Sequence, residues 1–153
     1  MKASFERRLP VILRWTLGVV FLWAAISKLA DPIGFFRDLL SYRLPFPDPL
    51  LRFVAATLPW LEGLCGLMLL AGLWLRGAIC GVLALCSIFV LCTGQAWVRG
   101  LDISCGCLNL SFLGLDQSVS RFFESAAVAC LRATVLLAMA FYLLRKVEGG
   151  RPK

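Results

Sequence analysis

Four long apolar runs restrict what this chain can fold into more than any other feature of the sequence. They cover approximately residues 10–30, 50–73, 78–98 and 121–144. Each is about 20 residues or longer, the length that an α-helix needs to cross the hydrocarbon core of a bilayer. Hydrophobic residues make up 60% of the 153-residue chain, and the mean hydropathy is +0.84. The sequence therefore predicts one membrane domain over residues 1–153, an all-α integral membrane protein with a four-transmembrane-helix up-down bundle.

The first run has a competing interpretation as a cleaved signal peptide. It is longer than a usual signal core, and Lys28 stands where small residues before a cleavage site are expected. We therefore interpret it as the first transmembrane helix, opened by Pro10. A tight turn over residues 74–77 is expected between the second and third spans.

The first outer loop contains a short amphipathic segment. Residues 33–44 alternate apolar side chains with Arg37, Asp38 and Arg43, a pattern typical of a short helix lying in the membrane interface. Asp48 followed by Pro49 predicts the N-cap and first turn of the second span. Pro59 is expected to interrupt and kink that span.

Basic residues are shared unequally between the two ends of the predicted bundle. Four spans place both termini on one side, and the positive-inside rule then predicts cytoplasmic termini and a periplasmic loop over residues 99–120 in a bacterial inner membrane. The net charge of +7 is interpreted in this way, and no nucleic-acid partner is expected. The basic residues on the side of the termini are Lys2, Arg7, Arg8, Arg76, Arg145, Lys146, Arg151 and Lys153, and those on the other side are Arg37, Arg43, Arg52, Arg99 and Arg121.

The predicted outer loop carries the stretch Cys105-Gly106-Cys107. Two thiols separated by one glycine are held within reach of each other, and a disulfide between them would close a very small ring. Strained, exposed disulfides tend to be labile or catalytic. The alternative is a chance pair of cysteines that act as small hydrophobes. The other five, expected to pack within the helices, are Cys65, Cys80, Cys86, Cys92 and Cys130, of which Cys92 lies close enough to the outer end to approach the loop.

Charged and polar side chains within the spans form the second candidate site, because such groups are costly in hydrocarbon. Glu62 and Arg132 each lie about twelve residues into a helix that starts at the outer face, roughly 18 Å deep, and we expect them to pair across the bundle. Lys28, Gln95 and Glu124 lie near the outer ends of three spans, and they are expected to form a polar vestibule beneath the cysteines. The alternative is that Glu62 and Arg132 only hold the bundle together and that Lys28 extends to lipid headgroups.

With these residues laid out, the sequence resembles the MauE/DoxX-like redox-associated membrane proteins over about residues 10–145. That resemblance implies a four-helix membrane bundle with a part in the redox maturation of periplasmic proteins, and methylamine dehydrogenase is the substrate that it implies for the methylamine utilisation protein itself. Here Leu108-Asn109 follow the cysteines, where members commonly have an aromatic-glycine pair. The matching stretches are Ser27-Lys28-Leu29, Tyr42-Arg43-Leu44-Pro45, Pro59-Trp60-Leu61-Glu62 with Gly63 and Gly66, Cys105-Gly106-Cys107, and Arg132.

The leading hypothesis is a membrane thiol–disulfide oxidoreductase in which Cys105 and Cys107 exchange with a periplasmic thiol protein or thioredoxin-like partner. The chain has no histidine, which excludes Cys–His catalysis and His-ligated haem, and no metal or nucleotide cofactor is indicated. A membrane quinone is the expected electron acceptor, bound near Lys28, Trp60, Glu62, Gln95 and Arg132. Two alternatives stay open, a Cu(I)-handling membrane protein and a non-catalytic membrane subunit of an oxidoreductase complex.

Overall fold

The computed structural model describes residues 2–100 and 126–149, and the elements within these ranges are all helices. They are α1 (Lys2–Ala30), α2 (Pro32–Ser41), α3 (Asp48–Ala71), α4 (Leu75–Val98) and α6 (Ala126–Gly149). Four of them are long and apolar enough to cross a membrane, over Arg8–Ala30, Asp48–Ala71, Leu75–Val98 and Ala127–Gly149. The predicted multi-pass all-α membrane fold is confirmed.

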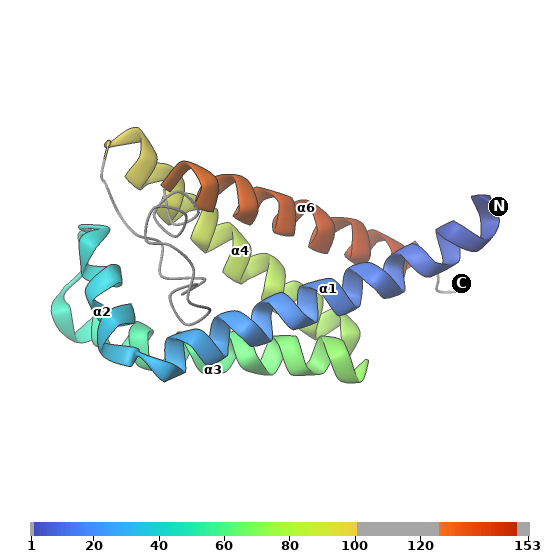
Figure 1. Ribbon diagram of the computed structural model, residues 1–153, viewed down its shortest axis with the longest axis horizontal. Coiled ribbons are helices and arrows are strands. Elements are labelled where there is room, and N and C mark those ends of the chain that lie inside the picture. Colours follow the sequence, from blue (N-terminus) through green and yellow to red (C-terminus); the bar gives the residue numbers. More distant parts are fainter. Residues whose placement is uncertain (1, 101–125, 150–153) are drawn as a thin grey trace, which may run out of the picture.

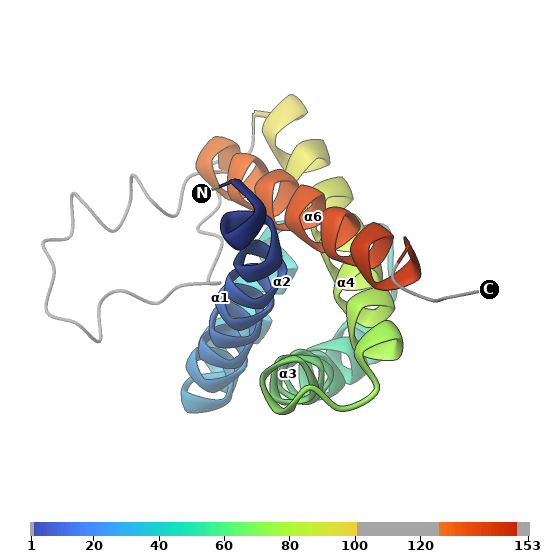
Figure 2. The same ribbon diagram turned by 90° about the vertical axis from the view of Figure 1, so that its right-hand side faces the viewer.

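The four long helices form an up-down bundle built from two pairs. Helix α1 packs along α3, and α4 packs along α6; the pairs then meet where α3 contacts α4 and α1 contacts α6. The end-on view shows the four helices arranged around one centre (Figure 2). Both chain termini lie at one end of the bundle, whereas α2 lies at the other (Figure 1). Helices α3 and α6 are diagonal neighbours and do not pack on each other within the described residues.

Small residues let α1 and α3 approach closely. The Gly66 Cα faces the backbone of α1, so that a Cβ there would lie 2.9 Å from the carbonyl oxygen of Gly18 and 2.9 Å from the amide nitrogen of Leu22. Cys65, on the same helix, packs against α4, because a Cβ at Gly81 would lie 2.8 Å from its Sγ. Small residues at membrane helix interfaces allow this close backbone packing. The α3 stretch around Cys65 and Gly66 therefore holds the bundle together.

An alanine at Gly66 is expected to separate α1 from α3, because its methyl group would overlap main-chain atoms that cannot move aside. We expect Gly66→Ala to lower the free energy of unfolding by about 1–3 kcal/mol. Gly94→Ala is the matched control, since no atom lies within 4 Å of a Cβ at that position. Thermal unfolding in detergent micelles would compare the two variants, and equal melting temperatures would contradict the close packing described.

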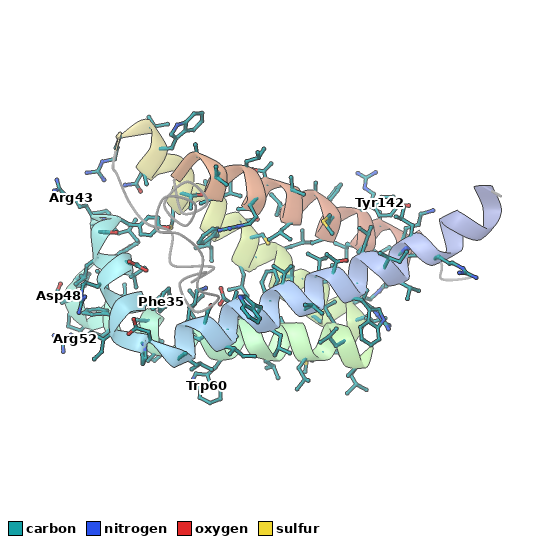
Figure 3. All side chains as sticks on the ribbon, in the orientation of Figure 1. Phe35, Arg43, Asp48, Arg52, Trp60 and Tyr142 are labelled. Atoms are coloured by element: carbon teal, nitrogen blue, oxygen red, sulfur yellow. The ribbon has the colours of Figure 1, made fainter. Side chains whose placement is uncertain are left out.

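Helix α2 confirms the predicted interfacial helix, and its start follows from local chemistry. The Asp31 carboxylate accepts a hydrogen bond from the amide of Gly34 at 2.9 Å, and Pro32 occupies the first turn, where its missing N–H costs nothing. Phe35 is the side chain of α2 that is buried. The helix therefore lies across the end of the bundle with one apolar side chain inserted into it (Figure 3).

Several predicted boundaries differ from those observed. Helix α1 begins before Pro10, and α3 continues through Pro59, with Pro47 and not Asp48 as its N-cap. The turn between α3 and α4 lies before the predicted residues 74–77, because Gly72 ends α3 in a left-handed conformation with φ of 73°. The amide of Leu73 then bonds the carbonyl of Met68 at 3.1 Å, which satisfies the end of the helix.

Candidate functional site

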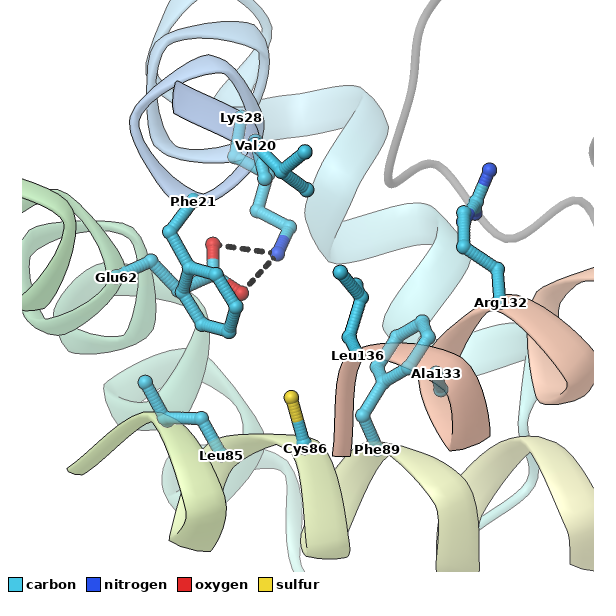
Figure 4. A pocket seen from close by; sticks show the side chains of 11 residues that line it. Val20, Phe21, Lys28, Glu62, Leu85, Cys86, Phe89, Arg132, Ala133 and Leu136 are labelled. Carbon is cyan, nitrogen blue, oxygen red and sulfur yellow. Dashed lines mark hydrogen bonds and ion pairs between the residues drawn. The ribbon is translucent and has the colours of Figure 1, made fainter. Parts of the chain in front are cut away.

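A cavity of about 60 Å³ lies between the two helix pairs, and all four long helices contribute to its wall. It lies in the half of the bundle away from the termini, since Lys28 is in the last turn of α1 and Arg132 is in the second turn of α6. Most of the wall is apolar, and four side chains supply its polar atoms (Figure 4). The lining residues are Val20, Phe21, Ala24, Lys28, Glu62, Leu85, Cys86, Phe89, Arg132, Ala133 and Leu136.

The central feature of the cavity is an ion pair between α1 and α3. The Lys28 ammonium donates to both carboxylate oxygens of Glu62, at 2.5 Å to Oε1 and 2.6 Å to Oε2. Lys28 is only 3% exposed and Glu62 only 8% exposed. Charge-assisted hydrogen bonds of this kind are roughly twice as strong as neutral ones, and they offset part of the cost of holding two charges away from water.

This pairing corrects the prediction that Glu62 would pair with Arg132. Arg132 does line the same cavity, but its side chain extends from α6 away from the Glu62 carboxylate (Figure 4). The physical reason is the order of helices around the bundle. Because α1 is the close neighbour of α3 while α6 is its diagonal neighbour, Lys28 reaches Glu62 over a short distance. Because the Lys28 ammonium is buried against Glu62, Lys28 lies in the polar site as expected, and the alternative that it extends to lipid headgroups is wrong.

An aromatic ring covers the ion pair on the side of α2. The Lys28 Nζ lies 5.1 Å from the centroid of the Phe35 ring, within the range of a cation–π interaction. Helix α2 is itself held against α3, where Arg52 lies 5.7 Å from the ring of Phe36. The Lys28 ammonium is thus enclosed by a carboxylate and a ring contributed by two different helices.

Cys86 is a member of this site that the sequence analysis missed. It is 4% exposed, lines the cavity, and its sulfur points from α4 toward the Lys28–Glu62 pair (Figure 4). The helical period of the sequence could have identified Cys86 as an inward-facing residue, because the buried residues of α4 recur about every one or two helical turns. These residues are Ala78, Ile79, Val82, Cys86, Thr93 and Ala96. The spacing of the cysteines alone did not reveal it.

Two predicted members of the vestibule do not line the cavity. Trp60 is 68% exposed and points away from the bundle (Figure 3), where it borders a shallow apolar groove on the surface of α3 with Phe53 and Leu64. Gln95 is half-buried on α4 but does not line the cavity. The structure therefore brings together Lys28, Glu62 and Arg132 and leaves Trp60 and Gln95 outside.

The predicted catalytic residues Cys105 and Cys107 lie outside the described residues, and so do Arg121 and Glu124. The chain leaves the described part at Gly100, after α4, and enters it again at Ala126, the first residue of α6. Both of these points lie at the end of the bundle opposite the termini (Figure 1).

The five described cysteines carry free thiols. Cys86 belongs to the main core cluster, Cys65 packs against that cluster, and Cys92 packs against Tyr42 and Ala96 near the C-terminal end of α4. Cys80, in contrast, is exposed, so the expectation that all five pack within the bundle is wrong for this residue. Over residues 2–100 and 126–149, no three acidic or cysteine side chains gather in a way that could hold a metal ion.

The cavity is small for a membrane quinone. Pockets that enclose organic ligands usually measure about 300–1,000 Å³, whereas this cavity measures about 60 Å³, enough for roughly four water molecules. Its polar groups have the chemistry to donate to a quinone carbonyl, but the space between the helices does not admit the ring. A quinone is therefore not accommodated by the cavity as it stands.

Comparison with known proteins gives one positive result. The family described as methylamine utilisation protein MauE matches residues 6–146 of the chain, which include three of the four candidate spans in full, most of the fourth, and the cavity-lining residues. No curated protein and no solved structure gives a significant match.

Proposed function

Because this chain belongs to the methylamine utilisation protein MauE family, we propose that it takes part in methylamine utilisation by exchanging thiols and disulfides with a periplasmic partner during that partner's maturation. Cys105 and Cys107 are the proposed reacting residues, and the bacterial inner membrane is the proposed location. A secreted enzyme subunit that needs several disulfides is the proposed substrate class. The periplasm supports such chemistry because it is an oxidising compartment.

The observation that carries the proposal is the buried Lys28–Glu62 pair in a cavity that is shared by all four long helices. Ionisable residues within membrane spans are expensive and usually mark a functional pathway. This cavity lies in the same half of the bundle as Gly100 and Ala126, between which the chain carries Cys105-Gly106-Cys107. Because the segment that carries two thiols joins the bundle at the same end as this cavity, we favour a redox role for the protein over a purely structural role.

The proposed exchange conserves atoms and electrons. A thiolate of the partner attacks one sulfur of the Cys105–Cys107 disulfide and forms a mixed disulfide, and the other cysteine leaves as a thiolate. A second thiolate of the partner then resolves the mixed disulfide. The partner loses two electrons and gains a disulfide, while Cys105 and Cys107 gain two electrons and end as thiols.

The reduced pair must then return two electrons to an acceptor. A membrane quinone, which becomes a quinol by taking two electrons and two protons, remains the proposed acceptor. Because the cavity is small for a quinone ring, the proposal requires that the ring bind at another surface. The apolar groove on the surface of α3 beside Trp60 and Phe53 is the proposed place for the ring.

Replacing Cys105 and Cys107 with serine tests the proposal in cells. We expect the double variant to leave the partner's cysteines reduced, with a loss of disulfide formation of at least about tenfold, because serine cannot form the mixed disulfide. Thiol trapping followed by gel-shift analysis of periplasmic proteins would measure this. Cys80→Ser is the matched control, since Cys80 is exposed and away from the cavity.

Each contrary outcome has a definite meaning. Unchanged partner disulfides with inert thiols would favour a non-catalytic membrane subunit. Stoichiometric Cu(I) bound by Cys105 and Cys107, without any cycle of oxidation and reduction, would favour a metal-handling protein.

A further inference from the structure

The end of the bundle that carries the termini has more positive charge than the opposite end. Among the described charged side chains other than Lys28, Glu62 and Arg132 of the cavity, five basic residues and one acidic residue lie at this end, against four basic and three acidic residues at the other. The residues at the terminal end are Arg8, Arg14, Arg76, Arg145, Lys146 and Glu148, and those at the other end are Arg37, Arg43, Arg52, Arg99, Asp31, Asp38 and Asp48. The terminal end therefore attracts anions.

Three of these cations lie at the same end of two helices that pack on each other, and we call this set the basic seam. Arg76 is the second residue of α4, and Arg145 and Lys146 are near the end of α6, which packs antiparallel along α4. Leu75 and Val147, their immediate neighbours in sequence, pack against the same core cluster. The basic seam therefore brings cations from both helices to one end of the α4–α6 pair.

Aromatic rings fix the two cations of α6. The Arg145 guanidinium lies 4.8 Å from the centroid of the Phe141 ring, and the Lys146 Nζ lies 5.8 Å from the centroid of the Tyr142 ring. Each ring is four residues earlier on the helix, so each cation is held over the preceding turn. Tyr142 lies on α6 toward the end that carries the termini (Figure 3).

These cations are available for an external anion. Arg145 and Lys146 are exposed and Arg76 is half-buried. Within residues 2–100 and 126–149, none of the three forms an ion pair with a carboxylate. Arginine presents a planar fork of donors that matches a phosphate group, and lysine adds a second charge beside it.

We propose that the seam formed by Arg76, Arg145 and Lys146 binds the phosphate headgroup of an anionic phospholipid. A lipid fits better than a free anion because exposed aromatic side chains lie at the same end of α4 and α6 as the cations. Trp74 is 77% exposed at the turn before α4, and Phe141 is 49% exposed, as expected of an interfacial aromatic belt. Below this belt the apolar faces of α4 and α6 continue toward the centre of the span, where acyl chains would lie. Basic seams between transmembrane helices are a recurring form of headgroup site.

Native mass spectrometry of the full-length protein in mild detergent tests the proposal. Phosphatidylglycerol, phosphatidylcholine and inorganic phosphate would each be titrated. We expect bound phosphatidylglycerol to survive release from the micelle, and Arg145→Gln/Lys146→Gln to weaken its affinity by about tenfold or more. Arg37→Gln/Arg43→Gln removes the same charge from the opposite end and is the matched control, expected to retain wild-type affinity.

A second variant separates charge from folding. Arg145→Lys/Lys146→Arg keeps both charges and is expected to bind phosphatidylglycerol within about threefold of the wild type. Equal affinity for phosphatidylglycerol in all variants would overturn the proposal, and so would equal affinity for phosphatidylcholine. Binding of inorganic phosphate as tight as that of the lipid would show a free-anion site instead. If the double glutamine variant does not fold, Lys146→Gln alone gives the same comparison with a smaller expected effect.

Discussion

Replacing Glu62 with leucine is expected to lower the free energy of unfolding by about 3–5 kcal/mol. The substitution removes the carboxylate that accepts both hydrogen bonds from Lys28, and it leaves the ammonium buried in the interior of the bundle, where Lys28 is only 3% exposed. Lys28→Met should have a similar effect, because it leaves the Glu62 carboxylate without its cation. A shift of this size is a large fraction of the stability of a protein of this length.

Thermal unfolding of purified protein in detergent micelles would measure the effect. Arg37→Met removes an exposed charge on α2 and is expected to change the free energy of unfolding by no more than about 0.5 kcal/mol. The reversed pair Lys28→Glu/Glu62→Lys is expected to recover part of the loss. If Arg132→Met proves as destabilising as Glu62→Leu while Lys28→Met has no effect, then Glu62 pairs with Arg132 and the arrangement described is wrong.

The sequence predicts the spans well because bilayer thickness acts on each helix separately. Any stretch that must satisfy its backbone in hydrocarbon has to be helical and about 20 residues long, so hydropathy alone identifies α1, α3, α4 and α6. The amphipathic pattern of residues 33–44 likewise predicts α2, whose burial of Phe35 follows from its own periodicity. The observed boundaries of α3 differ from the predicted ones by a few residues, because Pro47 is its N-cap and Gly72 its C-cap.

The sequence does not predict which helices are neighbours, and the wrong partner for Glu62 follows from this. Equal depth made Arg132 a reasonable partner, but depth gives no information on position around the bundle axis. That position depends on the close approach of α1 and α3 at Gly66 and Gly18, a property of two helices together. Lys28 lies in the last turn of α1, where a side chain is often exposed, but Phe35 of α2 covers its ammonium.

The angular position of each residue around its helix, in contrast, can be calculated from the sequence. It would have excluded two predicted site residues, Trp60 and Gln95, from the cavity. Trp60 precedes Glu62 by two residues, which is about 200° of rotation, so the two side chains point to opposite sides of α3. Gln95 follows Cys86 by nine residues, about 900°, and is again on the other side of α4. Thr93 follows Cys86 by seven residues and shares its buried face, so phase also predicts Cys86 as an inward-facing thiol.

Replacing both members of the pair, as Lys28→Met/Glu62→Leu, is expected to restore most of the stability that either single substitution removes. Two apolar side chains of similar volume leave no unpaired charge, and replacing a buried ion pair in this way is often neutral or stabilising, by about 1–4 kcal/mol. The double variant therefore separates a structural role of the pair from a functional one. Its melting temperature should lie near that of the wild type and well above those of Lys28→Met and Glu62→Leu.

The same double variant is nevertheless expected to fail in the oxidation of the periplasmic partner. In the proposed cycle, reoxidation of two thiols releases two protons, and the paired ionisable groups of Lys28 and Glu62 are the proposed proton acceptors. Positioned proton-transfer groups contribute about 10²–10⁴-fold to a rate, so we expect partner disulfides to form at least about 100-fold more slowly, as measured by thiol trapping. A folded double variant that oxidises the partner at the wild-type rate would show that the pair only holds α1 against α3, and the proposed exchange would then lose the structural observation that supports it and rest on Cys105 and Cys107 alone.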